Sequence, residues 1–291
     1  MSTDRHTGLA SLCIVLAGSL WGLYWVPVRT LAAAGLAGPR GSLLVVAIAF
    51  ALLVVAMMVV RPPLGRVDPL SAMANAAGGA AFMLYSVGLV EGRISSVILL
   101  FYLTPVWTTL ITACVLRWPV PRLRYVVIAL GLTGLVLVLG VQDGVPLPRA
   151  PGEWLGLSAG ALWSVASVGM RVRGEMPPLA GSTVFAAGAL MVGGLLWLAL
   201  PLDASAPAVS IDAESAAWAV AAALVWWIGS LLALVWAAAR LEPARVGILL
   251  MSEVLVGVLS SALFAGESLA AAQIAGAALL LAAGTLDALT N

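Results

Sequence analysis

The sequence is poor in charge and has few of the histidines and cysteines that bind transition metals. Charged residues make up 9% of its 291 residues, none of them is lysine, and His6 is the only histidine. A soluble domain carries about 25% charged residues, so this composition excludes one. The two cysteines, Cys13 and Cys114, lie inside apolar runs, which indicates small core residues and neither a disulfide nor a metal site. A formal net charge of +1 gives no indication of a nucleic-acid partner.

Apolar runs fill most of the chain. Hydrophobic residues make up 63% of it, and the runs are close to the ~20 residues that a helix needs to cross the hydrocarbon core. Short connections rich in Pro, Gly and Arg, such as residues 61–66, separate the runs. These features predict an all-α integral membrane protein with ten transmembrane helices and no soluble domain. The predicted spans are residues 9–31, 42–60, 70–90, 94–116, 123–141, 154–171, 179–200, 215–239, 244–265 and 269–289.

The arginines predict the orientation of these spans. With the N-terminus inside, ten of the 14 arginines fall on the cytoplasmic side, and Arg29, Arg40, Arg93 and Arg149 fall outside. Short cytoplasmic loops of membrane proteins carry an excess of basic residues, and the reverse topology would invert this ratio. We therefore predict a multi-pass protein of a bacterial-type inner membrane, with both termini cytoplasmic and the polar residues 1–7 retained.

The two halves of the chain repeat each other. Residues 17–22 are Ala-Gly-Ser-Leu-Trp-Gly, and residues 159–164, 142 positions later, are Ala-Gly-Ala-Leu-Trp-Ser. Five spans in each half is an odd number, so the second copy inserts with the opposite orientation. The pattern predicts two inverted five-helix repeats, residues 1–145 and 146–291. It is typical of a transporter whose substrate site lies between the repeats near the bilayer midplane.

Further motifs lie in the fourth span of the first half and in the fourth and fifth spans of the second half. They are Leu103-Thr104-Pro105-Val106 in the fourth span, Ser252-Glu253-Val254-Leu255 in the ninth, Ala265-Gly266-Glu267 after it, and Gln-Ile-Ala-Gly-Ala-Ala-Leu at 273–279 in the tenth. With the paired Trp motifs, these resemble the EamA-type family of the drug/metabolite transporter superfamily over the whole chain. The resemblance implies ten spans in two repeats. It also implies export of small polar metabolites or hydrophobic cations; some members export amino acids, and others carry nucleotide sugars.

The chain departs from the family pattern at two places. Arg117-Trp118 stands where the first repeat of the family often has Gly-Glu, which argues against a symmetric pair of acids, one from each repeat. Val254 stands where proline is common, which predicts a ninth span that is straighter than the fourth.

Aromatic and polar side chains in the middle of spans are the candidates for a substrate cavity. A buried Tyr or Trp needs a hydrogen-bond partner, and several at one depth suit a cavity wall, although helix packing alone would also place some of them there. Trp21 and Trp163 occupy equivalent repeat positions, and helical spacing puts Asn75, Phe82 and Tyr85 on one inward face of the third span. The candidate cavity residues are Trp21, Tyr24, Trp25, Asn75, Phe82, Tyr85, Tyr102, Trp163, Trp226, Trp227 and Ser230.

Glu253 is the only acid well inside a predicted span. An ionised carboxylate at a helix centre costs about 2.5–3.5 kcal/mol on insertion scales, so it must face the bundle interior, be paired or be protonated. Two interpretations stay open here: ion coupling through a proton or a bound cation, or a structural hydrogen bond to a neighbouring helix. Arg29 likewise either attracts a substrate carboxylate or extends toward lipid headgroups. Pro27 and Pro105 remove backbone hydrogen bonds within spans and are the candidate hinges.

No enzyme signature is found in the sequence, and no cofactor or metal is expected. The sequence favours an exporter of a small amphipathic metabolite that works by alternating access. Its expected partners are the lipid bilayer, a small-molecule substrate and protons. The aromatic content of the predicted cavity favours an amino acid as substrate. An aromatic amino acid is favoured most, because flat rings stack on Trp and Tyr. The alternatives are a multidrug exporter of cationic amphiphiles, a non-transporting membrane scaffold and an intramembrane enzyme.

Overall fold

The computed structural model describes residues 2–63, 68–117, 122–139, 147–173, 176–199, 212–238, 240–241 and 243–290. Within these ranges every regular element is a helix. The elements are α1 (Ser2–Gly22), α2 (Trp25–Ala33), α3 (Pro39–Val60), α4 (Pro69–Glu91), α5 (Ile94–Phe101), α6 (Thr104–Cys114), α7 (Arg122–Leu139), α8 (Pro151–Arg173), α9 (Pro178–Ala199), α10 (Ala213–Ala222), the π-helix η1 (Ala223–Ser230), α11 (Leu231–Ala238), α12 (Pro243–Leu250), α13 (Ser252–Phe264) and α14 (Ala271–Thr290).

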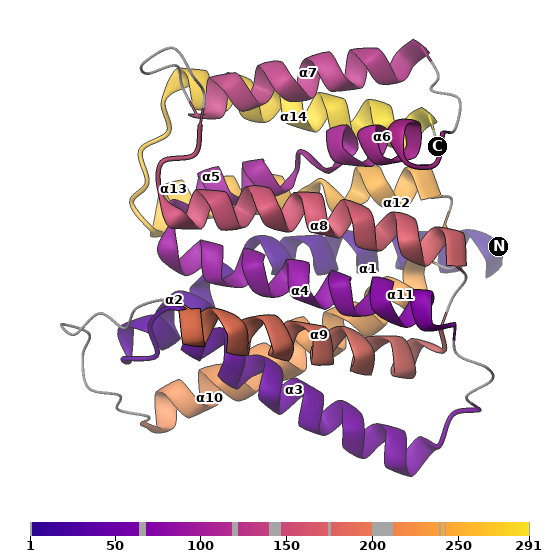
Figure 1. The fold of residues 1–291 in the computed structure, drawn as a ribbon, viewed down its shortest axis with the longest axis vertical. Coiled ribbons are helices and arrows are strands. Elements are labelled where there is room, and N and C mark those ends of the chain that lie inside the picture. The colour runs from indigo at the N-terminus through magenta and orange to yellow at the C-terminus, as the bar shows by residue number, and fades with distance from the viewer. Residues whose placement is uncertain are drawn as a thin grey trace.

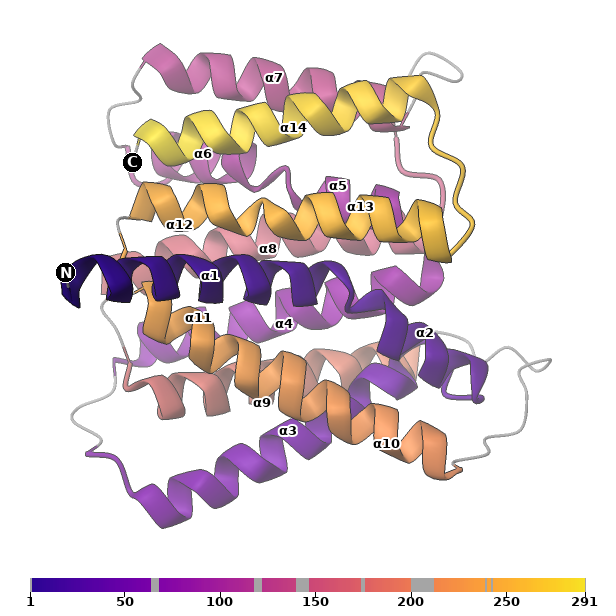
Figure 2. The same ribbon diagram turned by 180° about the vertical axis from the view of Figure 1, so that it is seen from behind.

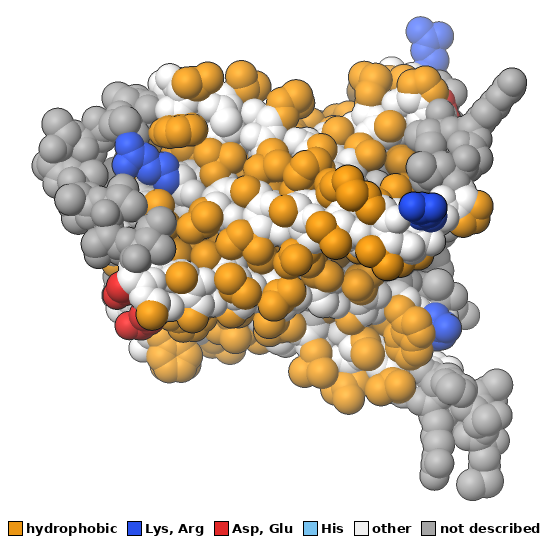
Figure 3. Space-filling model, turned by 90° about the horizontal axis from the view of Figure 1, so that it is seen from below, with side chains coloured by type: hydrophobic (Ala, Val, Ile, Leu, Met, Phe, Trp, Pro, Cys, Tyr) orange, Lys and Arg blue, Asp and Glu red, His pale blue; other side chains and the backbone are white. Residues whose placement is uncertain are grey.

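The lengths and composition of these helices confirm a multi-span helical membrane protein. Seven helical segments of the described chain are long and apolar enough to cross a bilayer. Three shorter apolar helices, Tyr125–Val138, Ile248–Phe264 and Ala271–Leu286, lie at the fifth, ninth and tenth predicted spans. Large apolar side chains such as Val59 and Leu198 are exposed, as lipid-facing residues are. In Figure 3, apolar side chains cover the visible face, and the charged ones lie toward its two ends.

The helices run along one common direction, and the two termini lie at the same end of the bundle (Figures 1 and 2). α7 and α14 pack against each other along one edge, and α3 packs on α9 toward the other. Between them, α4 packs on α8 and α9, and α1 packs on α13. The interior is therefore lined by helices from both halves of the chain. The predicted boundary between the two halves lies outside the described residues.

Glycines allow helices from the two halves to come into backbone contact. A Cβ atom on Gly79 of α4 would overlap with the carbonyl of Phe185 in α9, and one on Gly188 would overlap with the carbonyl of Ala76. Small residues at such crossings allow the close approach that stabilises helix pairs in lipid. The crossing of α4 and α9 thus depends on positions where no other residue fits without a backbone shift.

Three of the predicted spans are each interrupted between two helices. α1 and α2 are separated at Leu23 and Tyr24, α5 and α6 at Tyr102 and Leu103, and α12 and α13 at Met251. The first two interruptions come just before Pro27 and Pro105, as expected from the missing backbone donors. The ninth span has no proline and is interrupted at one residue, Met251, whereas the fourth is interrupted at two. This shorter interruption does not contradict the prediction that the ninth span is straighter than the fourth. Such interruptions occur in membranes where the surrounding protein satisfies the freed backbone groups.

Candidate functional site

Ten aromatic rings form one cluster in the middle of the bundle. Phe82 of α4 contacts five of them, with ring centroids 4.7 Å from Trp21, 5.2 Å from Trp163 and 5.3 Å from Phe185. Trp21 and Trp163, the tryptophans of the two similar sequence motifs, therefore contact the same ring. We call this set the aromatic cluster; its members are Trp21, Tyr24, Phe82, Tyr85, Phe101, Tyr102, Trp163, Phe185, Trp226 and Trp227.

The polar edges of these rings are hydrogen-bonded across helices. The indole nitrogen of Trp227 in η1 donates to the hydroxyl of Tyr24 at 2.8 Å, and that of Trp226 donates to the carbonyl of Leu20 at 2.5 Å. The hydroxyl of Ser86 in α4 lies 3.4 Å from the Tyr24 hydroxyl and 2.6 Å from that of Ser42 in α3. Tyr24 itself lies in the interruption between α1 and α2. These contacts satisfy polar groups that lipid could not.

Glu253 lies at the polar end of the aromatic cluster, in the first turn of α13. Its Oε2 accepts a hydrogen bond from the hydroxyl of Tyr102 at 2.7 Å, and its Oε1 accepts one from the hydroxyl of Tyr85 at 3.2 Å. The Tyr102 hydroxyl is also 3.4 Å from the carbonyl of Leu250, the last residue of α12. We call Tyr85, Tyr102 and Glu253 the carboxylate site. It joins three spans from both halves of the chain, and two of these spans are interrupted beside it.

The carboxylate site faces the bundle interior. Glu253 shares a helical face with Gly257 and Ser260, which are buried, whereas Leu255 and Leu259 on the other face are 50% and 58% exposed. Glu253 and Tyr102 are each partly buried. The carboxylate is therefore held by hydrogen-bond donors of the protein on the inward face of α13.

Three of the predicted cavity residues belong neither to the aromatic cluster nor to the carboxylate site. The Asn75 amide donates to the Ser71 carbonyl at 2.8 Å and lies 3.5 Å from the Met176 sulfur, about two turns from Phe82. The indole of Trp25 donates to the hydroxyl of Ser260 at 3.0 Å. The hydroxyl of Ser230 donates to the carbonyl of Trp226 in its own span. The structure gives these three side chains packing partners and places none of them in the carboxylate site.

Sequence reasoning missed two members of the aromatic cluster, Phe101 and Phe185. Phenylalanine carries no polar group, so within an apolar run it gives no sign of facing a neighbouring helix instead of lipid. Both side chains are almost fully buried. Their position depends on the crossings of α4 with α9 and of α5 with α8, which the sequence pattern alone does not specify.

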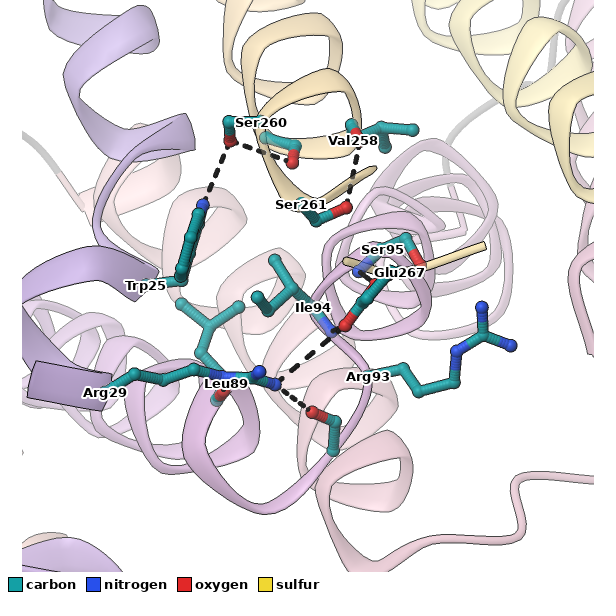
Figure 4. Close-up of polar contacts among 12 residues, drawn as sticks. Trp25, Arg29, Leu89, Arg93, Ile94, Ser95, Val258, Ser260, Ser261 and Glu267 are labelled. Carbon is teal, nitrogen blue, oxygen red and sulfur yellow. Dashed lines mark hydrogen bonds and ion pairs between the residues drawn. The ribbon is translucent and has the colours of Figure 1, made fainter. Parts of the chain in front are cut away.

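A second polar group lies at the end of the bundle opposite the termini (Figure 4). Arg29 donates to the carbonyls of Leu89 at 2.9 Å and Gly92 at 2.7 Å, and its Nη2 is 3.9 Å from Glu267 Oε1. Glu267 accepts hydrogen bonds from the backbone N–H of Ile94 and from the backbone N–H and hydroxyl of Ser95. The guanidinium is thus engaged by the protein, which neither interpretation of Arg29 from the sequence had predicted.

Comparison with known proteins adds information about the fold only. No family model matches the sequence, and no curated protein matches it. A solved structure described as "Crystal structure of protein" superposes with a TM-score of 0.58, covering 99% of this chain and 97% of that chain at 20% identity. At this identity the likeness establishes a shared arrangement of helices and says nothing about substrate.

Proposed function

We propose that this chain is an inner-membrane transporter of the EamA type, in the drug/metabolite transporter superfamily, with ten spans and cytoplasmic termini. It exports a small amphipathic metabolite by alternating access. The favoured substrate class is amino acids, and among these the aromatic amino acids. The observation that carries this proposal is the carboxylate site beside the aromatic cluster, between the two halves and next to interrupted helices. Polar sites at interrupted helices near the midplane are the usual substrate and ion sites of secondary transporters.

The contacts of four glycines support the inverted repeats. Gly18 and Gly22 in α1, the first helix of the first half, face the backbone of α13. Gly156 and Gly160 in α8, the first helix of the second half, face the backbone of α5. The same small-residue face thus joins the first span of each half to the fourth span of the other half. Two inverted copies that exchange partners would produce this pairing.

Reconstitution into liposomes tests the proposed function directly. Downhill uptake of a labelled aromatic amino acid without added energy is the expected result. Uptake of a quaternary cationic amphiphile in its place would favour the multidrug alternative, because the same rings bind cations through their π faces. If correctly folded protein transports no solute, the remaining alternatives are a membrane scaffold and an intramembrane enzyme.

Trp163→Ala and Tyr102→Ala are each expected to lower the initial rate of this uptake by about tenfold, since ring contacts are worth up to about 1.5 kcal/mol beyond their buried area. Membrane yield should stay near normal. The matched control is Trp197→Ala, because Trp197 is 50% exposed and lies near the end of α9. An equal loss in the control would show that membership of the aromatic cluster is not the property that matters.

The proposed orientation can be tested by thiol labelling in a variant without Cys13 and Cys114. Two exposed positions are replaced by cysteine, one at a time: Leu147 in the connection before α8 and Pro63 in the connection after α3. An impermeant thiol reagent added to the periplasmic side is expected to label Leu147→Cys only. Labelling of Pro63→Cys instead would reverse the topology and place the termini outside.

A further inference from the structure

Within the described part of the chain, the centre of the bundle provides one acid and no base. Among the described side chains, Glu253 has only the hydroxyls of Tyr85 and Tyr102 as hydrogen-bond partners. The described arginines lie near the ends of their helices or in the connections between them. Arg29, the one placed deepest along its span, is held by two backbone carbonyls and Glu267 at the far end. The N-terminus of α13, the other positive feature nearby, already has Glu253 in its first turn.

This arrangement matches a primary ammonium group. Such a group presents three N–H donors, and the site offers the two carboxylate oxygens and the hydroxyl oxygens of Tyr85 and Tyr102 as acceptors. Phe101 lies against both tyrosines, with ring centroids 4.8 Å from Tyr85 and 5.7 Å from Tyr102. A molecule bound by its ammonium group therefore has rings beside it to contact its apolar part.

A carboxylate on the same molecule would have no partner here. Moving an ionised carboxylate out of water is costly unless it is paired, and close to Glu253 it would also meet a like charge. An amino acid would bear this cost, whereas the corresponding amine would not.

We propose that Tyr85, Tyr102 and Glu253 form an ammonium-binding subsite, and that the molecules it selects are aromatic primary amines, with no recognition of a carboxylate. This inference rests on the proposed function, since it names the substrate class of the same site. It keeps the ring and the amine of the proposed substrate and replaces the aromatic amino acid by the corresponding amine, so it departs from the proposed function in the acid group alone.

Three probes of one ring size test the subsite by binding to purified protein in detergent. They are phenethylamine (amine only), phenylalanine (amine and acid) and 3-phenylpropionate (acid only), and the readout is quenching of tryptophan fluorescence or calorimetry. The expected Kd for phenethylamine is at least tenfold lower than that for phenylalanine, with no measurable binding of 3-phenylpropionate. Equal or tighter binding of phenylalanine, or no binding of phenethylamine to folded protein, would overturn the proposal.

Variants then assign the effect to the carboxylate. Glu253→Gln is expected to raise the Kd for phenethylamine at least tenfold and to reduce its preference over phenylalanine. Tyr85→Phe and Tyr102→Phe should each raise the Kd for phenethylamine by a smaller factor. The matched control is Glu91→Gln, an acid at the exposed end of α4, which should change nothing. If Glu253→Gln is unstable, Glu253→Asp, which keeps the charge, should retain the preference for the amine; an unchanged Kd in Glu253→Gln would overturn the proposal.

Flux measurements separate this inference from the proposed function. Transport of phenylalanine at the same rate as phenethylamine, unaffected by Glu253→Gln, would overturn the ammonium subsite and leave the transporter standing. Selective binding of phenethylamine with no flux of any probe would support the subsite and overturn the transporter.

Discussion

Glu253→Gln is expected to abolish proton-driven accumulation of substrate while the protein remains folded. Glutamine keeps the shape of the side chain and can still accept a hydrogen bond from Tyr102 or Tyr85, but it cannot gain or lose a proton. Accumulation under an imposed pH gradient should fall at least tenfold, a factor equivalent to about 1.4 kcal/mol. The pH dependence of flux should flatten, and the thermal unfolding midpoint should stay near the wild-type value.

The structural interpretation of Glu253 predicts the opposite pattern. Glutamine would then transport nearly normally, while Glu253→Ala would lower stability by about 1–3 kcal/mol, because the hydroxyls of Tyr85 and Tyr102 would lose their acceptor. Among the described residues, these two tyrosines are the titratable groups that face Glu253; α1 presents Gly18 and Gly22 to this part of α13. A pH profile in Glu253→Gln identical to the wild type would therefore remove Glu253 from the coupling mechanism.

Gly188→Ala should strongly destabilise the protein, although alanine normally favours a helix. The added methyl group would overlap with the backbone carbonyl of Ala76, so α9 and α4 would have to move apart. Overpacking of this kind costs typically about 1–3 kcal/mol, and more where backbone must shift. We expect a thermal unfolding midpoint in detergent several degrees lower than that of the wild type, with reduced membrane yield.

The same helix provides the control for this prediction. Gly194 lies six residues after Gly188 in α9, and a Cβ atom there would meet nothing within 4 Å. Gly194→Ala should be neutral or stabilising by about 0.5–1 kcal/mol, since alanine loses less backbone entropy than glycine. Equal effects of the two substitutions would mean that α4 and α9 do not cross as closely as the structure shows.

For Glu253 and its partners, the sequence predicted only part of the site. The mid-span position of Glu253 predicted that it must be paired, protonated or inward-facing, because an unpaired charge deep in lipid is costly. Its partners, Tyr85 and Tyr102, are more than 140 residues away along the chain. Nothing in the local pattern links these positions, so their hydrogen bonds had to come from the packing of α4, α5 and α13.

The sequence by itself determined that the chain is helical and lies in a membrane. Lipid forces each spanning segment to satisfy its backbone hydrogen bonds internally, so apolar length and proline positions are enough to place most helices and the interruptions near Pro27 and Pro105. Only the tertiary structure decided the interruption at Met251, the aromatic contacts of Phe101 and Phe185, and the engagement of Arg29 by Glu267. These features depend on which helix lies beside which. In lipid that choice rests on small residues and close packing between distant segments and not on hydrophobicity, so the periodicity of a single segment does not contain it.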